Sequence, residues 1–172
     1  MPQQNSGTLG RASGTERFGV CDVIRKVVAC LIRPGRSGPE LLVFTHPDGS
    51  VQIPKGTLED GESAEAAVLR ELREESGISE AAIEASVVDL DYRTPQSTLD
   101  GVPLQEQLWQ IFRLRSDKPI PDSWQHRASG SPEEDGLVFS CRWICLSRAK
   151  QHLHQLYHPV IDALLAQDSE AG

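Results

Sequence analysis

The sequence predicts an α/β fold in which a mixed β-sheet packs between helices. Runs of β-branched and aromatic residues occur in both halves of the chain, and an apolar stripe at helical spacing separates the two groups of runs. The order strands, helix, strands, helix is typical of a sheet covered by helices. A chain of 172 residues is long enough for one sizeable core and short for two. We expect a flexible N-terminal tail over residues 1–18, which offer little to bury, and a single domain over residues 19–172.

The first strands are expected between residues 26 and 53. The run KVVACLI at residues 26–32 is rich in β-branched side chains, and ELLVFTH at residues 40–46 follows it after the turn sequence RPGRSGP. These two runs predict an antiparallel hairpin. The turn sequence PDGS then leads into a short third strand at residues 51–53.

A helix is predicted over residues 63–76, where the apolar period changes to that of a helix. Ser63 has the side chain of an N-cap residue, Glu65 stands in the first turn, and Gly77 occupies the place of a left-handed C-cap residue. The apolar stripe of this helix consists of Ala66, Ala67, Leu69 and Leu72.

The second half of the chain predicts a polar loop between two strands and a helical end. We expect the loop over residues 117–135, and loops of that length in compact domains tend to be functional or mobile. Residues 147–154 and 159–167 predict two short helices or one broken helix. The longer strands of this half are expected at residues 83–93, 104–114 and 136–146.

The charge balance disfavours duplex nucleic acid as a partner. The chain has 17 Lys and Arg residues against 25 Asp and Glu residues, which gives a formal net charge of -8. A protein that binds duplex nucleic acid electrostatically must neutralise phosphates with basic residues. A polyanionic substrate would therefore need local basic residues or metal ions here.

We expect a soluble, cytoplasmic protein that does not contact membranes. No apolar run approaches the roughly 18 residues of a membrane span, and the N-terminus lacks the hydrophobic core of a signal peptide. The four cysteines lack CxxC spacing, and three of them stand in apolar runs, which favours buried free thiols over a zinc site or disulfides.

Three glutamates crowd the predicted helix. Glu71 and Glu75 are one turn apart on one face and Glu74 lies beside them, so their carboxylates should come within a few ångströms of one another. A divalent cation would convert this repulsion into attraction, and hard oxygen donors select Mg²⁺ or Mn²⁺ over zinc. The alternative is a solvated helix with local salt bridges, because Arg70 stands four residues before Glu74.

The loop before the helix favours the metal interpretation. Glu62 is positioned to meet Arg70 about two turns on, and Gly56, in a turn, lets its carbonyl approach an ion closely. The stretch GTLEDGESAEAAVLRELREESGI resembles the whole Nudix box, which reads glycine, five residues, Glu, seven residues, then Arg-Glu-aliphatic-any-Glu-Glu-any-Gly-aliphatic. The matching positions are Gly56, Glu62, Arg70, Glu71, Leu72, Glu74, Glu75, Gly77 and Ile78.

The resemblance implies an α/β/α sandwich with a mixed central sheet and the box as loop, helix and loop. It also implies an enzyme that hydrolyses a nucleoside diphosphate linked to another moiety, with a nucleotide-type small molecule as substrate and Mg²⁺, or Mn²⁺, as cofactor. Metal ions would neutralise and orient the phosphates for attack by water. Carried onto this chain, the metal ligands would be Glu71, Glu74, Glu75 and the Gly56 carbonyl, with Arg70 orienting Glu71 and Glu62 holding Arg70.

The general base has two candidate sources. Glu71 is the first candidate because it belongs to the implied metal site. Some relatives use a carboxylate from a distal loop, and Glu133 and Glu134 stand in the sequence SPEEDG of the expected long loop. The alternative for SPEEDG is a charged turn without a catalytic role.

Residues near the box suggest a substrate. Lys55 gives the sequence IPKG, which looks like that of dinucleoside polyphosphate hydrolases, and a lysine there would suit an extra phosphate. The alternative for Lys55 is an exposed turn lysine. Trp124 in the polar segment is a candidate for a substrate lid that stacks on a base, with Arg127 nearby for phosphate. Core packing is the interpretation of Trp109.

Alternative functions stay open. The chain would otherwise be a nucleoside triphosphate pyrophosphohydrolase that cleans nucleotide pools, or a non-catalytic nucleotide-sensing module with the same fold. An RNA 5′-end hydrolase would need a basic groove, and the negative net charge of the chain counts against such a groove. A homodimer is a further hypothesis, and light scattering that shows a monomer at micromolar concentration would end it.

Overall fold

Strand β1 (Ile24–Arg33) lies between two cores, and its side chains alternate between them. In the computed structural model, which describes residues 23–94 and 105–170, Val28, Cys30 and Ile32 enter one core while the residues between them enter the other. The β-branched run that predicted this strand is thus buried on both faces. The expected flexible tail, residues 1–18, lies outside the described residues.

The sheet is mixed. Its main strand order is β5-β6-β1-β2-β8-β7, with β3 on β2 and β4 on β1. Strand β6 pairs with β1 in parallel, whereas the other pairs are antiparallel. The remaining strands are β2 (Glu40–Thr45), β3 (Val51–Gln52), β4 (Lys55–Thr57), β5 (Ala82–Thr94), β6 (Gln105–Arg115), β7 (Ser123–Arg127) and β8 (Val138–Cys145).

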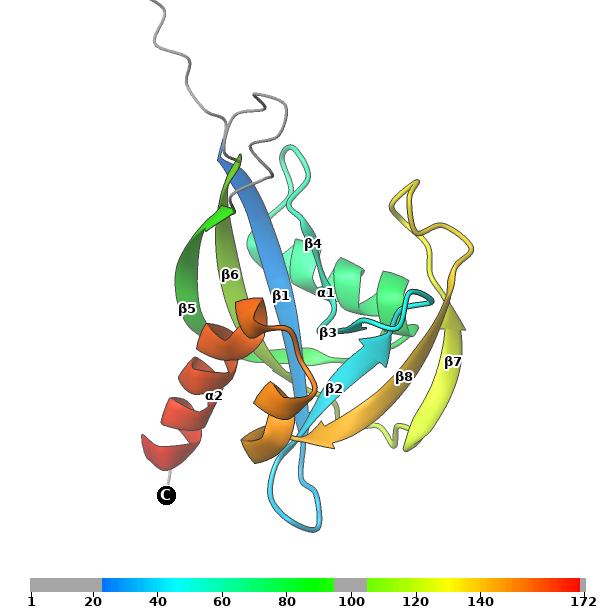
Figure 1. The fold of residues 1–172 in the computed structure, drawn as a ribbon. Helices are drawn as coiled ribbons and strands as arrows, with labels where there is room; N and C mark the ends of the chain where they lie inside the picture. The colour runs from blue at the N-terminus through cyan, green and yellow to red at the C-terminus, as the bar shows by residue number, and fades with distance from the viewer. Residues whose placement is uncertain (1–22, 95–104, 171–172) are drawn as a thin grey trace, which may run out of the picture.

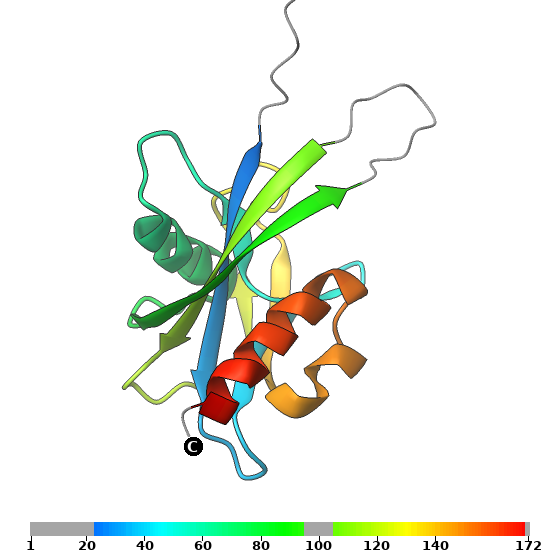
Figure 2. The same cartoon turned by 90° about the vertical axis from the view of Figure 1, so that its left-hand side faces the viewer.

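Helices α1 (Ala64–Ser76) and α2 (His158–Glu170) cover opposite sides of the strands (Figures 1 and 2). Helix α1 buries Ala67, Val68 and Leu72 in one core, and α2 buries Val160, Ile161 and Leu164 in the other. Two short 3₁₀ helices, η2 (Leu146–Gln151) and η3 (Gln155–Tyr157), lead into α2. The predicted sheet between helices is therefore confirmed as an α/β/α arrangement.

Helix α1 begins and ends at the predicted caps. The Ser63 hydroxyl accepts a hydrogen bond from the Ala66 N–H at 3.1 Å, and Gly77 has a left-handed φ of 79° while its N–H donates to the Arg73 carbonyl. These caps set where the helix begins and ends. The apolar residues that pack in the core set its buried face, on which Glu71 and Glu75 also lie.

The predicted hairpin of β1 and β2 forms only at its turn. The two strands pair at Ile32 with Leu41 and at Arg33 with Glu40, and then they diverge. Strand β1 continues between β4 and β6, whereas β2 continues beside β8. The prediction of a simple hairpin is incomplete, because most of β1 pairs with β4 and β6 and most of β2 pairs with β8, strands that are farther away in the chain.

Two further expectations about backbone are wrong. Gly56 does not lie in a turn but in β4, opposite Val27 of β1. The expected loop over residues 117–135 contains strand β7, which pairs along β8. None of the helices within residues 23–94 and 105–170 has the length and apolar content to cross a membrane.

Candidate active site

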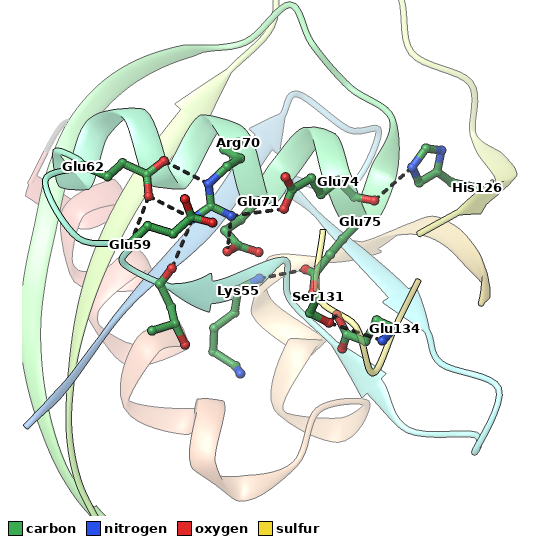
Figure 3. Close-up of polar contacts among 11 residues, drawn as sticks. Lys55, Glu59, Glu62, Arg70, Glu71, Glu74, Glu75, His126, Ser131 and Glu134 are labelled. Atoms are coloured by element: carbon green, nitrogen blue, oxygen red, sulfur yellow. Dashed lines mark hydrogen bonds and ion pairs between the residues drawn. The ribbon is translucent and has the colours of Figure 1, made fainter. Parts of the chain in front are cut away.

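The Arg70 guanidinium donates hydrogen bonds from all three of its nitrogens. Its Nε and Nη2 donate to the two carboxylate oxygens of Glu62, each at 2.9 Å, and Nη2 also donates to the Thr57 carbonyl at 3.1 Å. Its Nη1 donates to Glu71 Oε1 at 2.7 Å and to Glu74 Oε2 at 3.1 Å. Figure 3 shows this arginine surrounded by carboxylates from the loop and from α1. The contact expected between Glu62 and Arg70 is present.

The pairing changes the acidity of both partners. Hydrogen bonding to Glu62 raises the pKa of the Arg70 guanidinium above its ordinary value, and the same bond is the main reason why the pKa of Glu62 is lowered. The loop supports Glu62 as well, because the Glu59 N–H donates to its carboxylate at 3.2 Å. Glu62 therefore stays ionised beside Arg70.

Glu71 lies against a position that only glycine can occupy. A Cβ atom on Gly56 would stand 1.8 Å from Glu71 Oε1 and 2.1 Å from Oε2, far inside contact distance. The Glu71 side chain is largely buried, and burial is the main reason why its pKa is raised. The absence of a side chain on β4 thus creates the space for this carboxylate.

Glu75 is the most deeply buried acid of the helix. It is 3% exposed, and its Oε2 accepts a hydrogen bond from the Lys55 N–H at 2.8 Å. Burial raises the pKa of Glu75 well above its ordinary value, and the negative charges of Glu134 and Glu71 raise it further. The site therefore concentrates negative charge on the buried face of α1.

A loop between β7 and β8 packs onto the same helix. The Ser129 N–H donates to the Glu74 carbonyl at 3.2 Å, and a His126 ring nitrogen lies 3.0 Å from that same carbonyl oxygen. Gly130 has a φ of +103°, and a Cβ there would come within 2.2 Å of Glu74 Oε2. The absence of a side chain at Gly130 thus allows the loop to pack closely against Glu74.

This loop brings Glu134 toward the box, and Glu133 less so. Glu134 is half-buried, its N–H donates to the Ser131 hydroxyl at 3.2 Å, and its charge acts on Glu71 and Glu75. Glu133 is exposed. Figure 3 shows Glu134 and Ser131 on the side of Glu75. Of the two loop glutamates named from the sequence, Glu134 is the better placed.

A cavity of about 400 Å³ is lined by residues of β1, β4, α1 and the loop between β7 and β8. Lys26 of β1 and Lys55 of β4 belong to its lining, and the Lys26 ammonium donates to the Thr57 hydroxyl at 3.2 Å. Burial is the main reason why the pKa of Lys26 is lowered, and the neighbouring Lys55 lowers it further. The lining includes Lys26, Lys55, Gly56, Arg70, Glu71, Glu74, Gly130, Glu133 and Glu134. Lys26 was missed from the sequence, where its only signal is a charged residue at the start of a buried strand.

The donor chemistry fits a hard divalent cation. Glu71 and Glu75 are buried carboxylates, and the absence of a side chain at Gly56 makes room for the Glu71 carboxylate against β4. The three helix carboxylates do not converge on one point, however, because Arg70 binds Glu71 and Glu74 while Glu75 faces the Lys55 N–H. Within the described ranges, no group of three or more acidic, histidine or cysteine side chains is arranged to hold a metal ion. The three glutamate carboxylates therefore meet only in part the expectation that they come together at one point.

Trp124 and Arg127 lie in β7 and use their polar groups locally. The Trp124 indole N–H donates to the Ser76 carbonyl at 2.8 Å, and its ring packs against the core under α1. The Arg127 guanidinium donates to the Gly136 carbonyl at 2.7 Å. Trp124 is thus partly buried beside the core, and a role for either residue in substrate binding stays a prediction. Trp109 is buried, as expected.

Comparison with known proteins gives a consistent family. The family model described as NUDIX domain matches residues 23–164. An RNA pyrophosphohydrolase of Shewanella pealeana is 32% identical over 120 residues, which cover 65% of this chain and 68% of that protein. An RNA pyrophosphohydrolase of Pasteurella multocida is 34% identical over 128 residues, which cover 70% of this chain and 63% of that protein.

Solved structures share the fold. The Ap4A hydrolase of C. elegans in a binary complex has a TM-score of 0.59 and 16% identity, over 86% of this chain and 99% of that chain. The NUDIX domain of Shewanella oneidensis NrtR, complexed with ADP ribose, has a TM-score of 0.60 and 16% identity, over 84% of this chain and 88% of that chain. At these identities the likeness concerns the fold alone.

Proposed function

The chain belongs to the NUDIX family, as a hydrolase of pyrophosphate bonds, and from this premise we propose that it acts on a nucleoside diphosphate linked to another moiety with Mg²⁺ as cofactor. The observation that carries the proposal is the cavity whose lining brings Glu71, Glu74 and Glu134 together with Lys26 and Lys55. Acids without cations would repel a polyphosphate, and lysines without acids would bind it without activating water. The combination suits phosphoanhydride hydrolysis.

The cofactor would be held by oxygen ligands. We propose Glu71, Glu74, Glu75 and the Gly56 carbonyl as the residues that hold Mg²⁺, with Mn²⁺ as the alternative ion. When bound, the cation supplies positive charge that neutralises phosphate oxygens and makes water a better nucleophile. The raised pKa of buried Glu71 and Glu75 supports this assignment, because a nearby cation would relieve the cost of ionising both carboxylates.

Arg70 and Glu62 act as positioning residues in this proposal. Arg70 binds one oxygen of Glu71, which leaves the other oxygen for ligand or proton binding. Glu62 fixes the orientation of the guanidinium plane through two parallel hydrogen bonds. Arg70 and Glu62 therefore hold the Glu71 side chain in one rotamer, while one of its two carboxylate oxygens stays available.

Two residues compete for the role of general base. Glu71 is the first candidate, since its buried carboxylate accepts a hydrogen bond from Arg70 and burial raises its pKa, which makes it a stronger base than an exposed glutamate. Glu134 is the alternative, supported by its position across the cavity from α1. Glu133 is exposed and has less support.

The substrate class follows from the phosphate-binding side. We propose a dinucleoside polyphosphate as the first candidate, because Lys55 adds a cation where a longer phosphate chain would pass. The 5′-triphosphate end of an RNA is the second candidate, favoured by the names of the relatives at 32% and 34% identity. Both present a nucleoside 5′-polyphosphate to the same cavity. Trp124 and Arg127 are weaker candidates for contacts with the substrate, since both are bonded elsewhere.

A reducing, cytoplasmic location belongs to the same proposal. Cys30, Cys141 and Cys145 are free thiols, and burial raises the pKa of Cys141 to about 12. A thiol with so high a pKa reacts slowly at neutral pH. Cys145 is less buried than the sequence suggested.

A substrate panel tests the function. Release of phosphate or mononucleotide would be measured with and without Mg²⁺ for dinucleoside tetraphosphates and hexaphosphates, 5′-triphosphate RNA, nucleoside triphosphates, ADP-ribose and diphosphoinositol phosphates. Mg²⁺-dependent turnover of a dinucleotide or of the RNA end is the expected result. Preference for free triphosphates would point to pool cleaning. Binding without any turnover would replace the hydrolase with a nucleotide-sensing module.

A further inference from the structure

The last carbonyl groups of α1 are held from the sheet side of the molecule. An α-helix leaves its final carbonyls without partners inside the helix, so other groups must bind them when the helix end is packed. In α1 each of the last four carbonyls has such a partner. The donors are the Gly77 N–H to Arg73, the His126 ring and the Ser129 N–H to Glu74, the Cys141 thiol to Glu75, and the Trp124 indole N–H to Ser76.

The edge strand β7 supplies two of these contacts with side chains that are two residues apart. Trp124 and His126 are the half-buried positions of the strand, and its other three residues are exposed. Because alternate residues of a strand share a face, both side chains point to the same side of the sheet. They reach the carbonyls of Ser76 and Glu74, which are also two residues apart. Strand β7 therefore matches the end of α1 residue by residue.

The contact between His126 and Glu74 fixes the tautomer of the histidine. A carbonyl oxygen can only accept, so His126 Nε2, which lies 3.0 Å from the Glu74 carbonyl oxygen, carries the hydrogen. On the other side of the ring, a Cβ atom at Gly77 would stand 2.8 Å from His126 Nδ1. The glycine that ends α1 thus also leaves room for the imidazole.

Glu74 is the residue at which α1 and the loop between β7 and β8 meet. Its carboxylate accepts a hydrogen bond from Arg70 Nη1 at 3.1 Å, and its carbonyl is bound by His126 and, at 3.2 Å, by the Ser129 N–H. Figure 3 shows Arg70 at the carboxylate of Glu74 and His126 at its carbonyl. Ser129 belongs to the loop that continues to Glu134. A shift of the Glu74 main chain would therefore move an acid of the helix relative to the acid of the loop.

We propose that His126 is a positioning residue, which acts through the Glu74 carbonyl to hold the helix glutamates at a fixed distance from the loop that carries Glu134. The inference rests on the proposed function, in which Glu74 holds the cation. His126 is not among the described residues that line the cavity of about 400 Å³, so its effect on a cation there is indirect. Groups that orient a metal ligand typically contribute about 10–100-fold to metal affinity or activity.

His126→Met and His126→Gln test the proposal as a matched pair. The two new side chains have the same length, and only glutamine carries an N–H donor for the Glu74 carbonyl. Titration of the full chain with Mn²⁺ in a calorimeter, without nucleotide, is the first measurement. His126→Met should weaken Mn²⁺ binding by about tenfold, and His126→Gln should restore most of the affinity. Gln125→Met, on the exposed face of the same strand, is the control and should change nothing.

Trp124→Phe separates positioning of Glu74 from general loosening of the helix end. It removes the donor to the Ser76 carbonyl and keeps an aromatic ring, so it should lower Tm and leave the Mn²⁺ affinity as it is. The same loss of Mn²⁺ affinity in Trp124→Phe and His126→Met would overturn the proposal. Unchanged affinity in His126→Met would also overturn it, and the hydrolase would stand if the wild type still turns substrate over.

Hydrogen exchange at the Ser129 amide, measured by NMR without metal, tests the contact independently of the hydrolase. His126→Met should speed this exchange, because Ser129 and His126 bind the same carbonyl, and His126→Gln should slow it again. A wild-type chain that neither binds Mn²⁺ nor hydrolyses any substrate removes the hydrolase, and the Ser129 exchange then decides alone. Exchange that is equal in the wild type and His126→Met would show that His126 does not hold the loop to the helix.

Discussion

Arg70 and Glu62 form a two-pronged ion pair, with Nε to Oε1 and Nη2 to Oε2 both at 2.9 Å. The pair links the loop before α1 to the glutamates on the helix, because the remaining guanidinium nitrogen binds Glu71 and Glu74. Planarity is essential to this arrangement, since a lysine ammonium cannot donate two parallel hydrogen bonds to one carboxylate while reaching two others.

Arg70→Lys should therefore lower both activity and stability. We expect turnover to fall at least about tenfold and the free energy of unfolding to drop by roughly 1–2 kcal/mol, less than for a fully buried ion pair. Urea unfolding and steady-state kinetics would check this. Arg73→Lys, at an exposed position of the same helix, is the matched control. Equal behaviour of the two variants would show that the ion pair has no positioning role.

Glu75→Gln should stabilise the metal-free protein while removing activity. The folded pKa of Glu75 lies above its ordinary value of 4.5, so the unfolded chain loses this proton first and stability falls as the pH rises above that value. The difference in unfolding free energy is expected to be small near pH 4 and to grow as the pH rises toward the folded pKa. Each kcal/mol corresponds to roughly 2–4 °C in Tm for a chain of this size. Thermal unfolding in chelator from pH 4 to pH 8 measures it, and a variant less stable than wild type at pH 8 would contradict the account.

Gly56→Ala should disturb Glu71 specifically. The added Cβ would overlap the Glu71 carboxylate, which must then leave its position, so we expect destabilisation by about 1–3 kcal/mol and a large loss of turnover. A double-mutant cycle with Glu71→Ala provides the control, because the clash disappears when the carboxylate is absent. Additive changes in unfolding free energy would show that the two positions do not interact.

Glu134→Gln separates the two candidates for the general base. If Glu134 takes the proton, turnover should fall by about 10²–10⁴-fold with little change in KM, whereas the neighbouring Glu133→Gln should be nearly silent. If Glu71 takes it, Glu134→Gln should change turnover only slightly, through the local charge. The pH profile of kcat adds a second readout, because loss of the base removes its acidic limb.

The sequence predicted the local features of this molecule better than the long-range ones. Ser63 and Gly77 were predicted as caps because capping depends on neighbouring residues, and the contact of Glu62 with Arg70 follows from loop length and helical period. Strand β7 was missed because SWQHR has little apolar alternation, and its stability comes from pairing with β8. Glycine at 130 and lysine at 26 were missed for the same reason, since their neighbours in space are far away in the chain.

The most direct test of the central claim is Mg²⁺-dependent hydrolysis by Glu74→Gln beside the wild type. The amide keeps the shape of the side chain that contacts Arg70 but removes its charge, so the fold should remain and activity should fall by on the order of 100-fold or more. Glu65→Gln, in the exposed first turn of the same helix, is the control and should keep full activity. Full Mg²⁺-dependent turnover by a folded Glu74→Gln variant would contradict the assignment of the helix glutamates as metal ligands.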